Sequence, residues 1–557
     1  MACSSRDRLA MIGLAGAAAL THATHVQQAD QFPSVLELSE LDGIIGFRLD
    51  GHSERGFSGS SVAPAGDVNG DGVDDIIIGA RFDDPDGRQM AGSSFVVFGR
   101  RTDQGRGFDP VVQLTDLDGT NGFKLIGPTR SLSGRAVACA GDLNSDGIDD
   151  IIIGAPDARP VDGGFQDGSS YVVFGRDTTV GKRFPKLIDL TALDGTDGFR
   201  MDGGRGDSSG SSVAAAGDVN GDGIEDLLIG APNANPGKLP SAGSIYVLFG
   251  RNTANDGTFP SVVKLPELNG RDGFRINGFE RYALAGYSVA SAGDVNADGV
   301  ADIVVGARRA SPGGLHWAGC IYVVFGRDAT AGATFPAALS LDQLHGVQGF
   351  SVQGFKRDGG IGASVACAGD INGDGVDDII IGAQYASPFG RTEAGSSYVV
   401  FGRGANDPAF PAALRLNELD ESTGFRLDGV NRHDRTGHSV AAAGDVDADG
   451  VNDIIVGAFR AAPQRRNDAG SSFVVFGRDA SDQQFPAVLD LADLDGTVGF
   501  RINGAAQGDN SGRSVAAAGD VNGDGIPDII IGAPDAYPSG RERAGSTYVL
   551  FGRSRGR

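Results

Sequence analysis

Oxygen-bearing side chains recur at fixed positions within a ten-residue segment that is broken by glycine. In its first copy, residues 66–75, acidic or amide side chains occupy the first, third, fifth and ninth positions after the opening glycine. These side chains can converge on one centre, and the carbonyl oxygen of the seventh residue adds a further donor. Gly72 permits the sharp bend that this wrapping needs. An all-oxygen, flexible ligand set of this kind is the one that Ca²⁺ prefers.

The segment occurs seven times, with the first aspartates 75 or 76 residues apart. One copy alone would also suit an Asx-rich hairpin turn without a metal, since Asn-Gly and Asp-Gly are ordinary turn signals. Seven copies favour metal binding, because packing these acidic groups together without a cation would be repulsive. We therefore expect about seven Ca²⁺ ions per chain. The predicted ligands are Asp67, Asn69, Asp71, Val73 and Asp75; Asp142, Asn144, Asp146, Ile148 and Asp150; Asp218, Asn220, Asp222, Ile224 and Asp226; Asp294, Asn296, Asp298, Val300 and Asp302; Asp370, Asn372, Asp374, Val376 and Asp378; Asp445, Asp447, Asp449, Val451 and Asp453; and Asp520, Asn522, Asp524, Ile526 and Asp528.

The sixth loop differs from the others in its charge. Asp447 stands where the other six copies have asparagine, so this loop has four carboxylates. We expect the additional negative charge to make this site among the tightest of the seven.

The constant period indicates one structural unit copied seven times. Each unit contains four short strand-like runs without a helical period, represented in the third copy by residues 199–203, 212–216, 227–231 and 245–251. Four short antiparallel strands repeated seven times predict an all-β, seven-bladed β-propeller, with the small-residue run innermost. The run at 47–51 is an outer strand that the last unit lacks, so we expect the N-terminal strand to close the ring. The Phe-Pro stretch typified by residues 184–195 is either a fifth strand or a connecting loop.

The composition and the N-terminal residues indicate which partners and which cellular location the protein has. The chain has 557 residues and a net charge of −25, and this negative sign argues against nucleic acid as a partner. In residues 1–31, Arg6 and Arg8 precede an apolar run and then small residues, which predicts a signal peptide and an N-terminal tail; a frayed tail is the alternative. The propeller then occupies residues 32–557. No other segment approaches 18 apolar residues, so we expect a secreted or cell-surface protein without a membrane span.

Two short motifs carry a family resemblance. Phe-Gly-Arg closes every unit, and Gly-Ala-Pro stands at 154–156, 230–232 and 532–534, after the metal loop. Together they resemble the FG-GAP repeat of the integrin α-subunit head, over about residues 32–553. The resemblance implies a seven-bladed propeller with calcium in hairpin loops on one face, and a role in cell adhesion. The chain departs from that pattern in carrying a metal loop in all seven units, and in the residues that replace the proline, which are Arg81, Arg308, Gln384 and Phe459.

Loops that differ between units are the candidates for partner binding. The segments at 203–210, 278–286, 354–362, 429–437, 233–242, 308–318, 384–394 and 459–469 vary, whereas the metal loops hardly change. We expect these variable loops on the face opposite the metal loops. Aromatic and arginine side chains, which are enriched at interface hot spots, gather there in units four to six, although scattered surface residues are the alternative. The candidate ligand-binding residues are Arg281, Tyr282, Trp317, Tyr385, Phe389, Phe459 and Arg460.

The sequence favours a binding module over an enzyme. The arginines after Phe-Gly repeat with the units, so we expect them to form structural ion pairs, and the histidines fall at unrelated offsets. The leading hypothesis is a secreted, calcium-binding, non-enzymatic module that adheres to an extracellular protein or glycan. The alternative is an enzyme such as a polysaccharide lyase or hydrolase, because a propeller fold does not fix a function.

Overall fold

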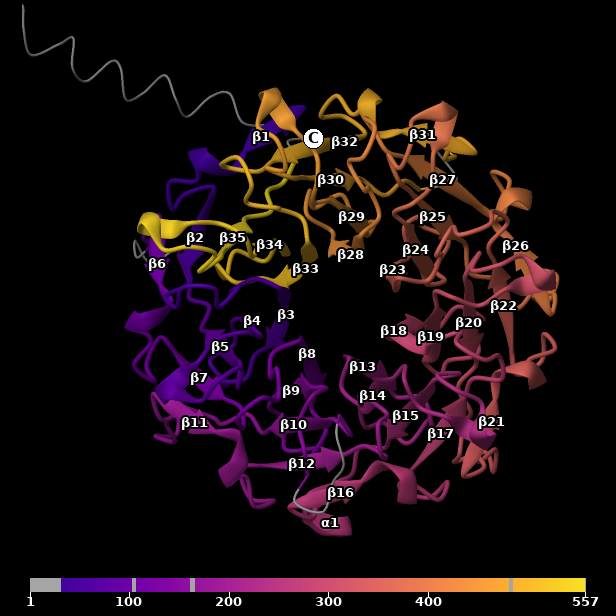
Figure 1. The fold of residues 1–557 in the computed structure, drawn as a ribbon, viewed down its shortest axis with the longest axis horizontal. Coiled ribbons are helices and arrows are strands. Elements are labelled where there is room, and N and C mark those ends of the chain that lie inside the picture. Colours follow the sequence, from indigo (N-terminus) through magenta and orange to yellow (C-terminus); the bar gives the residue numbers. More distant parts are fainter. Residues whose placement is uncertain (1–31, 103–106, 161–165, 480–483, 556–557) are drawn as a thin grey trace, which may run out of the picture.

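The computed structural model describes residues 32–102, 107–160, 166–479 and 484–555, and the predicted signal peptide at 1–31 lies outside them. The described strands form seven five-stranded sheets that are arranged radially around one axis (Figure 1). The chain passes once around the ring, so that the first and last units lie side by side. This arrangement confirms the predicted seven-bladed β-propeller.

Three strands of each blade form an antiparallel meander that runs outward from the axis. The innermost strands are β3 (Ser61–Gly66), β8 (Ala136–Gly141), β13 (Ser212–Gly217), β18 (Ala285–Gly293), β23 (Ser364–Gly369), β28 (Ser439–Gly444) and β33 (Ser514–Gly519). The second strands are β4 (Asp75–Ala80), β9 (Asp150–Ala155), β14 (Asp226–Ala231), β19 (Asp302–Ala307), β24 (Asp378–Ala383), β29 (Asp453–Ala458) and β34 (Asp528–Ala533). The third strands are β5 (Ser93–Val97), β10 (Ser169–Val173), β15 (Ser244–Leu248), β20 (Cys320–Val324), β25 (Ser396–Val400), β30 (Ser471–Val475) and β35 (Ser546–Leu550).

Two further strands complete the outer part of each blade. The fourth strands are β7 (Gly122–Ile126), β12 (Gly198–Asp202), β17 (Gly273–Asn277), β22 (Gly349–Gln353), β27 (Gly424–Asp428), β32 (Gly499–Asn503) and β2 (Gly46–Asp50). The fifth strands, in the same blade order, are β11 (Leu187–Asp189), β16 (Val262–Lys264), β21 (Ala338–Ser340), β26 (Ala413–Arg415), β31 (Val488–Asp490), β1 (Val35–Glu37) and β6 (Val111–Gln113).

Helical structure in the described residues is limited to short turns. The one α-helix, α1 (Thr253–Asp256), has four residues, and the 3₁₀ turns have three residues each. Those that follow a fifth strand are Leu38–Glu40, Leu114–Asp116, Leu190–Ala192, Leu265–Glu267, Leu341–Gln343, Leu416–Glu418 and Leu491–Asp493; those that follow a second strand are Pro85–Gly87, Pro236–Lys238, Pro312–Gly314, Pro388–Gly390, Pro463–Arg465 and Pro538–Gly540. None of the described helices is long and apolar enough to cross a membrane.

Side-chain size explains the radial order of the strands. All six residues of β4 are buried, because both faces of a second strand pack against neighbouring blades. The innermost strand β13 has the sequence Ser-Val-Ala-Ala-Ala-Gly, and only Val213 and Ala216 in it are buried. Small side chains allow seven strands to approach the axis without overlap. The predicted innermost position of the Ser-Val-Ala run is thus confirmed.

The stretch whose structure the sequence left open contains the fifth strand. Its three residues pair in parallel with the fourth strand of the preceding blade, as β11 does with β7, where Leu187 lies opposite Lys124. Each blade therefore has one strand more than the four predicted, and the chain makes an excursion to its neighbour before it returns as the fourth strand. This exchange covers the outer edge of every blade, where unpaired backbone groups would otherwise be exposed.

Two strands near the N-terminus close the ring. Strand β2 pairs antiparallel with β35, placing Gly46 opposite Leu550, as predicted for the N-terminal strand. Strand β1 supplies the fifth strand of the sixth blade by pairing in parallel with β32. Residues 35–50 thus complete the sixth blade and supply the fourth strand of the seventh, whose fifth strand is β6.

Phenylalanine rings fill each seam between neighbouring blades. Phe335, from the Phe-Pro stretch, stacks on Phe274 of the preceding blade with ring centroids 4.0 Å apart, and the Arg327 guanidinium lies 4.7 Å from the Phe335 ring. Equivalent stacks occur at all seven seams. The arginines after Phe-Gly therefore share a cation–π contact with phenylalanine, at 4.2–5.2 Å. The predicted ion pairs are found at two of these arginines, where Arg176 pairs with Asp197 at 3.0 Å and Arg251 pairs with Asp272 at 3.7 Å.

The seam stack provides a test of what holds the blades together. We expect Phe335→Ala to lower the free energy of unfolding by about 3–5 kcal/mol, because it removes a buried ring from a packed interface. Urea denaturation in calcium-containing buffer measures this loss. The matched control is Val347→Ala, since that side chain is 87% exposed and should change stability by less than about 0.5 kcal/mol. Equal effects of the two substitutions would contradict a dominant role for the stack.

Candidate functional site

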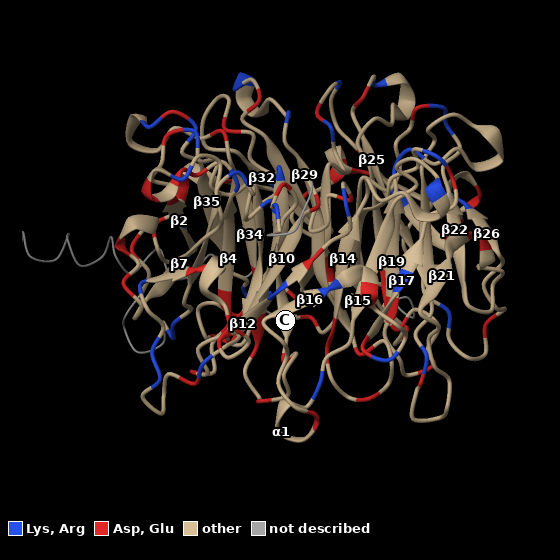
Figure 2. Ribbon diagram, turned by 60° about the horizontal axis from the view of Figure 1, so that its bottom comes forward, with Lys and Arg blue, Asp and Glu red and all other residues tan. Residues whose placement is uncertain are grey.

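The seven acidic loops all lie on one face of the propeller, where each connects the first and second strands of its blade. The lower side of Figure 2, from which α1 projects, is this face; we call it the metal-loop face. In the first blade the loop joins β3 to β4, and a register shift between Pro64 and Gly66 starts the turn. The structure thus brings together the predicted ligands of each loop, which the antiparallel hairpin holds in one place.

Backbone N–H groups orient two of the four side chains. The Oδ1 of Asp67 accepts a hydrogen bond from the N–H of Asp71 at 3.0 Å, and its Oδ2 accepts one from Gly72 at 2.8 Å. The Oδ1 of Asp71 accepts from the N–H of Val73 at 3.1 Å. The same pattern is found in the other six loops. These bonds fix the curvature of the loop and leave the second lone pairs of the oxygens available to a cation.

The aspartate at the ninth position joins the loop to the Phe-Gly motif. Asp75 is fully buried, and its Oδ1 accepts the N–H of Gly99 at 2.9 Å while its Oδ2 accepts the N–H of Val68 at 3.2 Å. An added Cβ on Gly99 would lie 2.2 Å from the carbonyl oxygen of Asp74, so this position requires glycine. The acidic loop and the Phe-Gly motif therefore recur in the same order in every unit because hydrogen bonds join them.

The electrostatics of the loops favour the binding of a cation. Burial, with repulsion from the other loop aspartates, raises the pKa of Asp302 and of Asp528 to about 8, and it raises the pKa of Asp75 well above the usual range. The buried Oδ1 of Asn69 has no hydrogen-bond partner, and the same holds for Asn144, Asn220 and Asn522. Buried oxygens are normally paired. A hard divalent cation would satisfy these oxygens and offset the repulsion, and we propose that each loop binds Ca²⁺.

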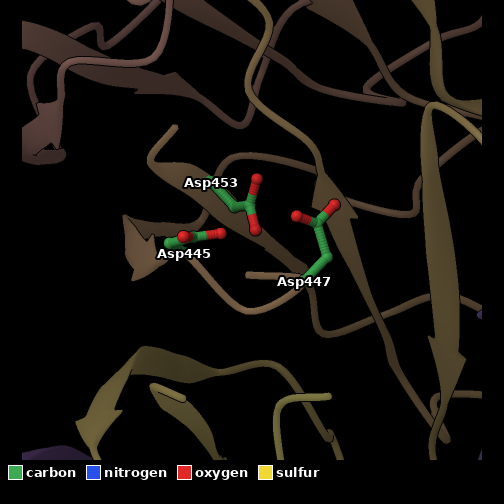
Figure 3. A group of neighbouring side chains, drawn as sticks. All are labelled: Asp445, Asp447 and Asp453. Atoms are coloured by element: carbon green, nitrogen blue, oxygen red, sulfur yellow. The ribbon is translucent and has the colours of Figure 1, made fainter. Parts of the chain in front are cut away.

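The sixth loop gathers three carboxylates around one point. Figure 3 shows Asp445, Asp447 and Asp453 directed toward one another, with one ligand oxygen of each within 4.8 Å of the others. Asp447 also forms an ion pair with Arg555, whose guanidinium lies 3.6 Å from the Phe476 ring. Burial raises the pKa of Asp447 to about 6, although the charge of Arg555 opposes this shift. The additional charge that predicted a tight sixth site is therefore already paired, which removes the basis for that ranking.

The sequence reasoning missed the residues that connect each loop to the next blade. The Oδ2 of Asp149, at the eighth position of the second loop, accepts the N–H of Asp67 in the first loop at 2.9 Å. From the segment after Phe-Gly-Arg, the N–H of Thr178 donates to the carbonyl oxygen of Asn69 at 2.8 Å. The recurrence of an acidic residue at the eighth position in four of the seven copies was the available signal. The metal loops thus lie at the seams, where a bound ion would stabilise the contact between blades.

The variable loops lie on the opposite face, as predicted from the order of strands, and we call it the variable face. Three of the candidate residues there are linked through short contacts. The Arg309 guanidinium lies 4.8 Å from the Trp317 ring, and the Arg309 N–H donates to the carbonyl oxygen of Ala283, which follows Tyr282. Gly360 donates its N–H to the carbonyl oxygen of Trp317 at 3.1 Å.

The same glycine extends this surface to the next blade. A Cβ on Gly360 would meet the Tyr385 ring at 3.3 Å, so Tyr385 lies beside the Trp317 loop. The Arg435 guanidinium in turn lies 4.5 Å from the Tyr385 ring. Tyr282, Trp317 and Tyr385 therefore lie on loops that contact one another, and we call these three exposed residues the aromatic strip.

The other four candidate residues do not join that strip. Phe459 and Arg460 line a separate cavity nearer the axis, of about 270 Å³. Arg281 is exposed, and Phe389 is exposed beside Arg391, which lies 5.2 Å from its ring. The candidate set that the sequence grouped by residue type thus divides into two sites and two isolated side chains.

Comparison with known proteins places these features in a family. The FG-GAP repeat matches residues 58–97, 134–173, 209–248, 285–324, 362–400 and 511–550. The chain contains six FG-GAP repeats. The sixth blade lies outside the matched ranges, yet it has the strands and the acidic loop of an FG-GAP blade. The predicted resemblance to the FG-GAP propeller of integrin α subunits is confirmed.

The chain is similar to two curated relatives and to one solved structure. Integrin alpha pat-2 of Caenorhabditis elegans is 30% identical over 259 residues, which are 45% of this chain and 18% of that protein. Phosphatidylinositol-glycan-specific phospholipase D of Dictyostelium discoideum is 26% identical over 71% of this chain and 38% of that protein. A solved structure titled BBS1N in complex with ARL6DN covers 92% of this chain and 94% of that chain, with a TM-score of 0.39 and 8% identity. The chain thus corresponds to a minor part of the length of the two curated relatives.

The proposal that the acidic loops bind Ca²⁺ can be tested by counting the bound ions and by removing them. We expect about seven Ca²⁺ ions per chain by elemental analysis, and a lower melting temperature in calorimetry after chelation, since an ion that binds only the folded state stabilises it. Asp374→Ala removes a fifth-position ligand and should reduce the count by about one while lowering the melting temperature. The control Asp493→Ala removes an exposed carboxylate outside the loops and should change neither quantity. A protein without calcium, or with identical melting before and after chelation, would refute the assignment.

Proposed function

We propose that this FG-GAP propeller is a secreted or cell-surface, calcium-stabilised module that binds an extracellular protein or glycan without catalysing a reaction. The aromatic strip on the variable face is the proposed contact surface. Its three rings are exposed by 54% for Tyr282, 39% for Trp317 and 38% for Tyr385. The metal-loop face has the invariant structural role, which leaves the variable face free to differ from blade to blade.

The observation that carries this proposal is the backbone conformation beneath the exposed rings. Tyr282 has a φ of +63° and Trp317 a φ of +47°, in the left-handed region that bulky residues rarely adopt. The scaffold imposes this conformation, because serine or glutamate takes it at the position of Trp317 in neighbouring blades, at Ser241 and Glu393. A smaller or more polar residue would therefore serve the fold as well. Large rings kept at a strained and exposed position support selection for binding.

Arginine side chains stack on two of the three rings of the aromatic strip. Arg309 stacks on Trp317 from one side, and the His316 ring stacks on it with centroids 4.4 Å apart. Arg435 stacks on Tyr385 and is itself paired with Glu393 at 2.8 Å. Rings that are already ordered lose less conformational entropy on binding than free side chains do. The strip therefore resembles a preorganised contact surface.

The enzyme alternative has one observation in its favour, the similarity to a relative named as a phospholipase D. That similarity covers 38% of the relative, so its activity does not transfer by alignment alone. Among the described histidines, His316 contacts Asp358 at 2.8 Å and His433 contacts Glu393 at 3.2 Å, both on the exposed surface. Sustained turnover in a screen of polysaccharides, esters and phosphodiesters would replace the binding proposal with an enzymatic one.

The aromatic strip makes a specific prediction about affinity. A partner is first isolated by a glycan array and by capture from extracellular fluid, and its affinity is measured by calorimetry. We expect Trp317→Ala or Tyr385→Ala to weaken that binding by about 1–4 kcal/mol, the range for an aromatic anchor in an interface. The melting temperature should stay nearly unchanged, because both side chains lie outside the buried core.

An exposed aromatic residue elsewhere on the variable face supplies the control. Tyr537 is 52% exposed and belongs to the seventh blade, outside the strip. Tyr537→Ala should leave affinity unchanged. Full affinity in both strip variants, together with loss of affinity in Asp374→Ala at full stability, would place the binding surface on the metal-loop face instead.

A further inference from the structure

Several arginine residues converge where the innermost strands begin, on the variable face. Arg135 and Arg513 immediately precede β8 and β33, and Arg81 immediately follows β4. The innermost strands surround the axis (Figure 1). The charges of Arg135 and Arg513 act on Arg81, so these arginines of blades 1, 2 and 7 lie close together. Arg460, from blade 6, lines the same cavity as Arg81 and Arg513. We call this set of four the axial arginine cluster.

Within the described residues, these four arginines make no ion pair. Their guanidinium groups instead contact aromatic rings: Arg513 lies 5.1 Å and Arg460 5.6 Å from the Phe459 ring. Arg81 lies 5.0 Å from the Phe82 ring, and its buried Nε has no hydrogen-bond partner. A cation–π contact holds a guanidinium in place but leaves its in-plane N–H donors unused.

The cavity contains carboxylates, but they only partly compensate this charge. It has a volume of about 270 Å³ and is lined by Phe57, Arg81, Phe459, Arg460, Asp468, Asn510, Arg513, Pro534 and Asp535. Asp535 accepts a hydrogen bond from Asn510 at 2.7 Å and pairs with Arg543 at 3.4 Å, so its charge is shared with a cation outside the cavity. Asp468 is exposed. Three guanidinium groups in the cavity thus face two carboxylates, while the charge of Arg135 on the neighbouring blade also acts on Asp157.

The local potential is positive although the chain carries a net charge of −25. Burial and the charges of Arg135 and Arg513 lower the pKa of Arg81 to about 10. Burial and the charges of Arg513, Arg435 and Arg460 lower the pKa of His438, which packs on Phe459 with centroids 4.4 Å apart, to about 3. Like charges held together in a partly buried site destabilise the protein unless a counter-charge binds there.

We propose that the axial arginine cluster binds a tetrahedral oxyanion, namely a sulfate or phosphate group, in the cavity between blades 6, 7 and 1. Guanidinium groups suit this chemistry because their paired N–H donors match two oxygens of such an anion. A single carboxylate can satisfy one guanidinium, whereas several converging arginines match the higher charge of a dianion. This site is separate from the aromatic strip and does not depend on a partner being bound there.

Sodium sulfate with the full, calcium-loaded chain is the direct probe. We expect sulfate to raise the melting temperature more than sodium chloride of equal ionic strength does, and to give a binding isotherm in calorimetry. Arg81→Gln and Arg513→Gln should abolish the sulfate-specific rise and weaken binding tenfold or more, as expected for loss of a charged hydrogen bond. Arg432→Gln is the control, because Arg432 is exposed on a loop of the same face outside the cluster.

The comparison between variants separates a specific site from general salt effects. Sulfate also stabilises proteins by exclusion from their surface, but that effect would be the same in all four proteins. An equal response of wild type, Arg432→Gln and the two cluster variants would overturn the proposal, as would no response beyond that to chloride. A calcium-dependent rise in melting temperature in each variant verifies that the propeller has folded.

A second pair of ligands distinguishes a sulfate ester on a glycan from a free ion as the source of the anion. Binding of a sulfated disaccharide through the cluster, with no binding of its desulfated form, supports a sulfate ester on a glycan as the natural ligand. Binding of free sulfate or phosphate with equal affinity supports a free ion. Failure of all of these anions to bind would refute the site while leaving the proposed role of the aromatic strip untouched.

Discussion

The buried aspartate at the ninth loop position is the constraint on which the rest of each blade depends. Asp75 and its six equivalents lie at the base of the acidic hairpin, where they accept N–H groups from the loop and from the glycine of Phe-Gly. Burying a carboxylate is costly unless it is paired. The hydrogen bonds supply part of that compensation, and the other loop oxygens surround a position that a cation can fill. The acidic loop and the Phe-Gly motif, the two most regular motifs of the sequence, are therefore the partners in one hydrogen-bonded interaction.

The same region determines how blades join into a ring. The segment after Phe-Gly-Arg bonds to the acidic loop of the preceding blade, and its arginine stacks on a phenylalanine that lies against that blade. The chain then adds a fifth strand to the same neighbour before it returns. Neighbouring blades thus contact one another on the metal-loop face, within the core and along the outer edge. Because these contacts repeat at each seam, the opposite face can vary in sequence while the ring stays closed.

That freedom explains the contrast between the two faces. The aspartates at the first and fifth positions of each loop accept the same backbone N–H groups in every blade, whereas aromatic and arginine side chains on the variable face differ from blade to blade. The aromatic strip spans the fourth and fifth blades, and the axial arginine cluster joins the sixth and seventh to the first two. The two sites differ in chemistry, since one offers flat apolar rings and the other offers unpaired positive charge. A glycan that carries anionic groups would be complementary to both.

The sequence by itself determined the fold and the acidic loops, because both depend on short-range spacing that repeats. Offsets of two and four residues place oxygens in one hairpin, and a period of 75 or 76 residues requires a repeated blade. Closure by Gly46–Asp50 followed from the same count of strands. The tertiary structure alone decided which blade receives each three-residue fifth strand, since so short a run has no signal for its partner. It also decided the pairing of Arg555 with Asp447 and the meeting of Arg81, Arg135 and Arg513. Those residues are far apart in the chain and become neighbours only when the ring closes around its axis.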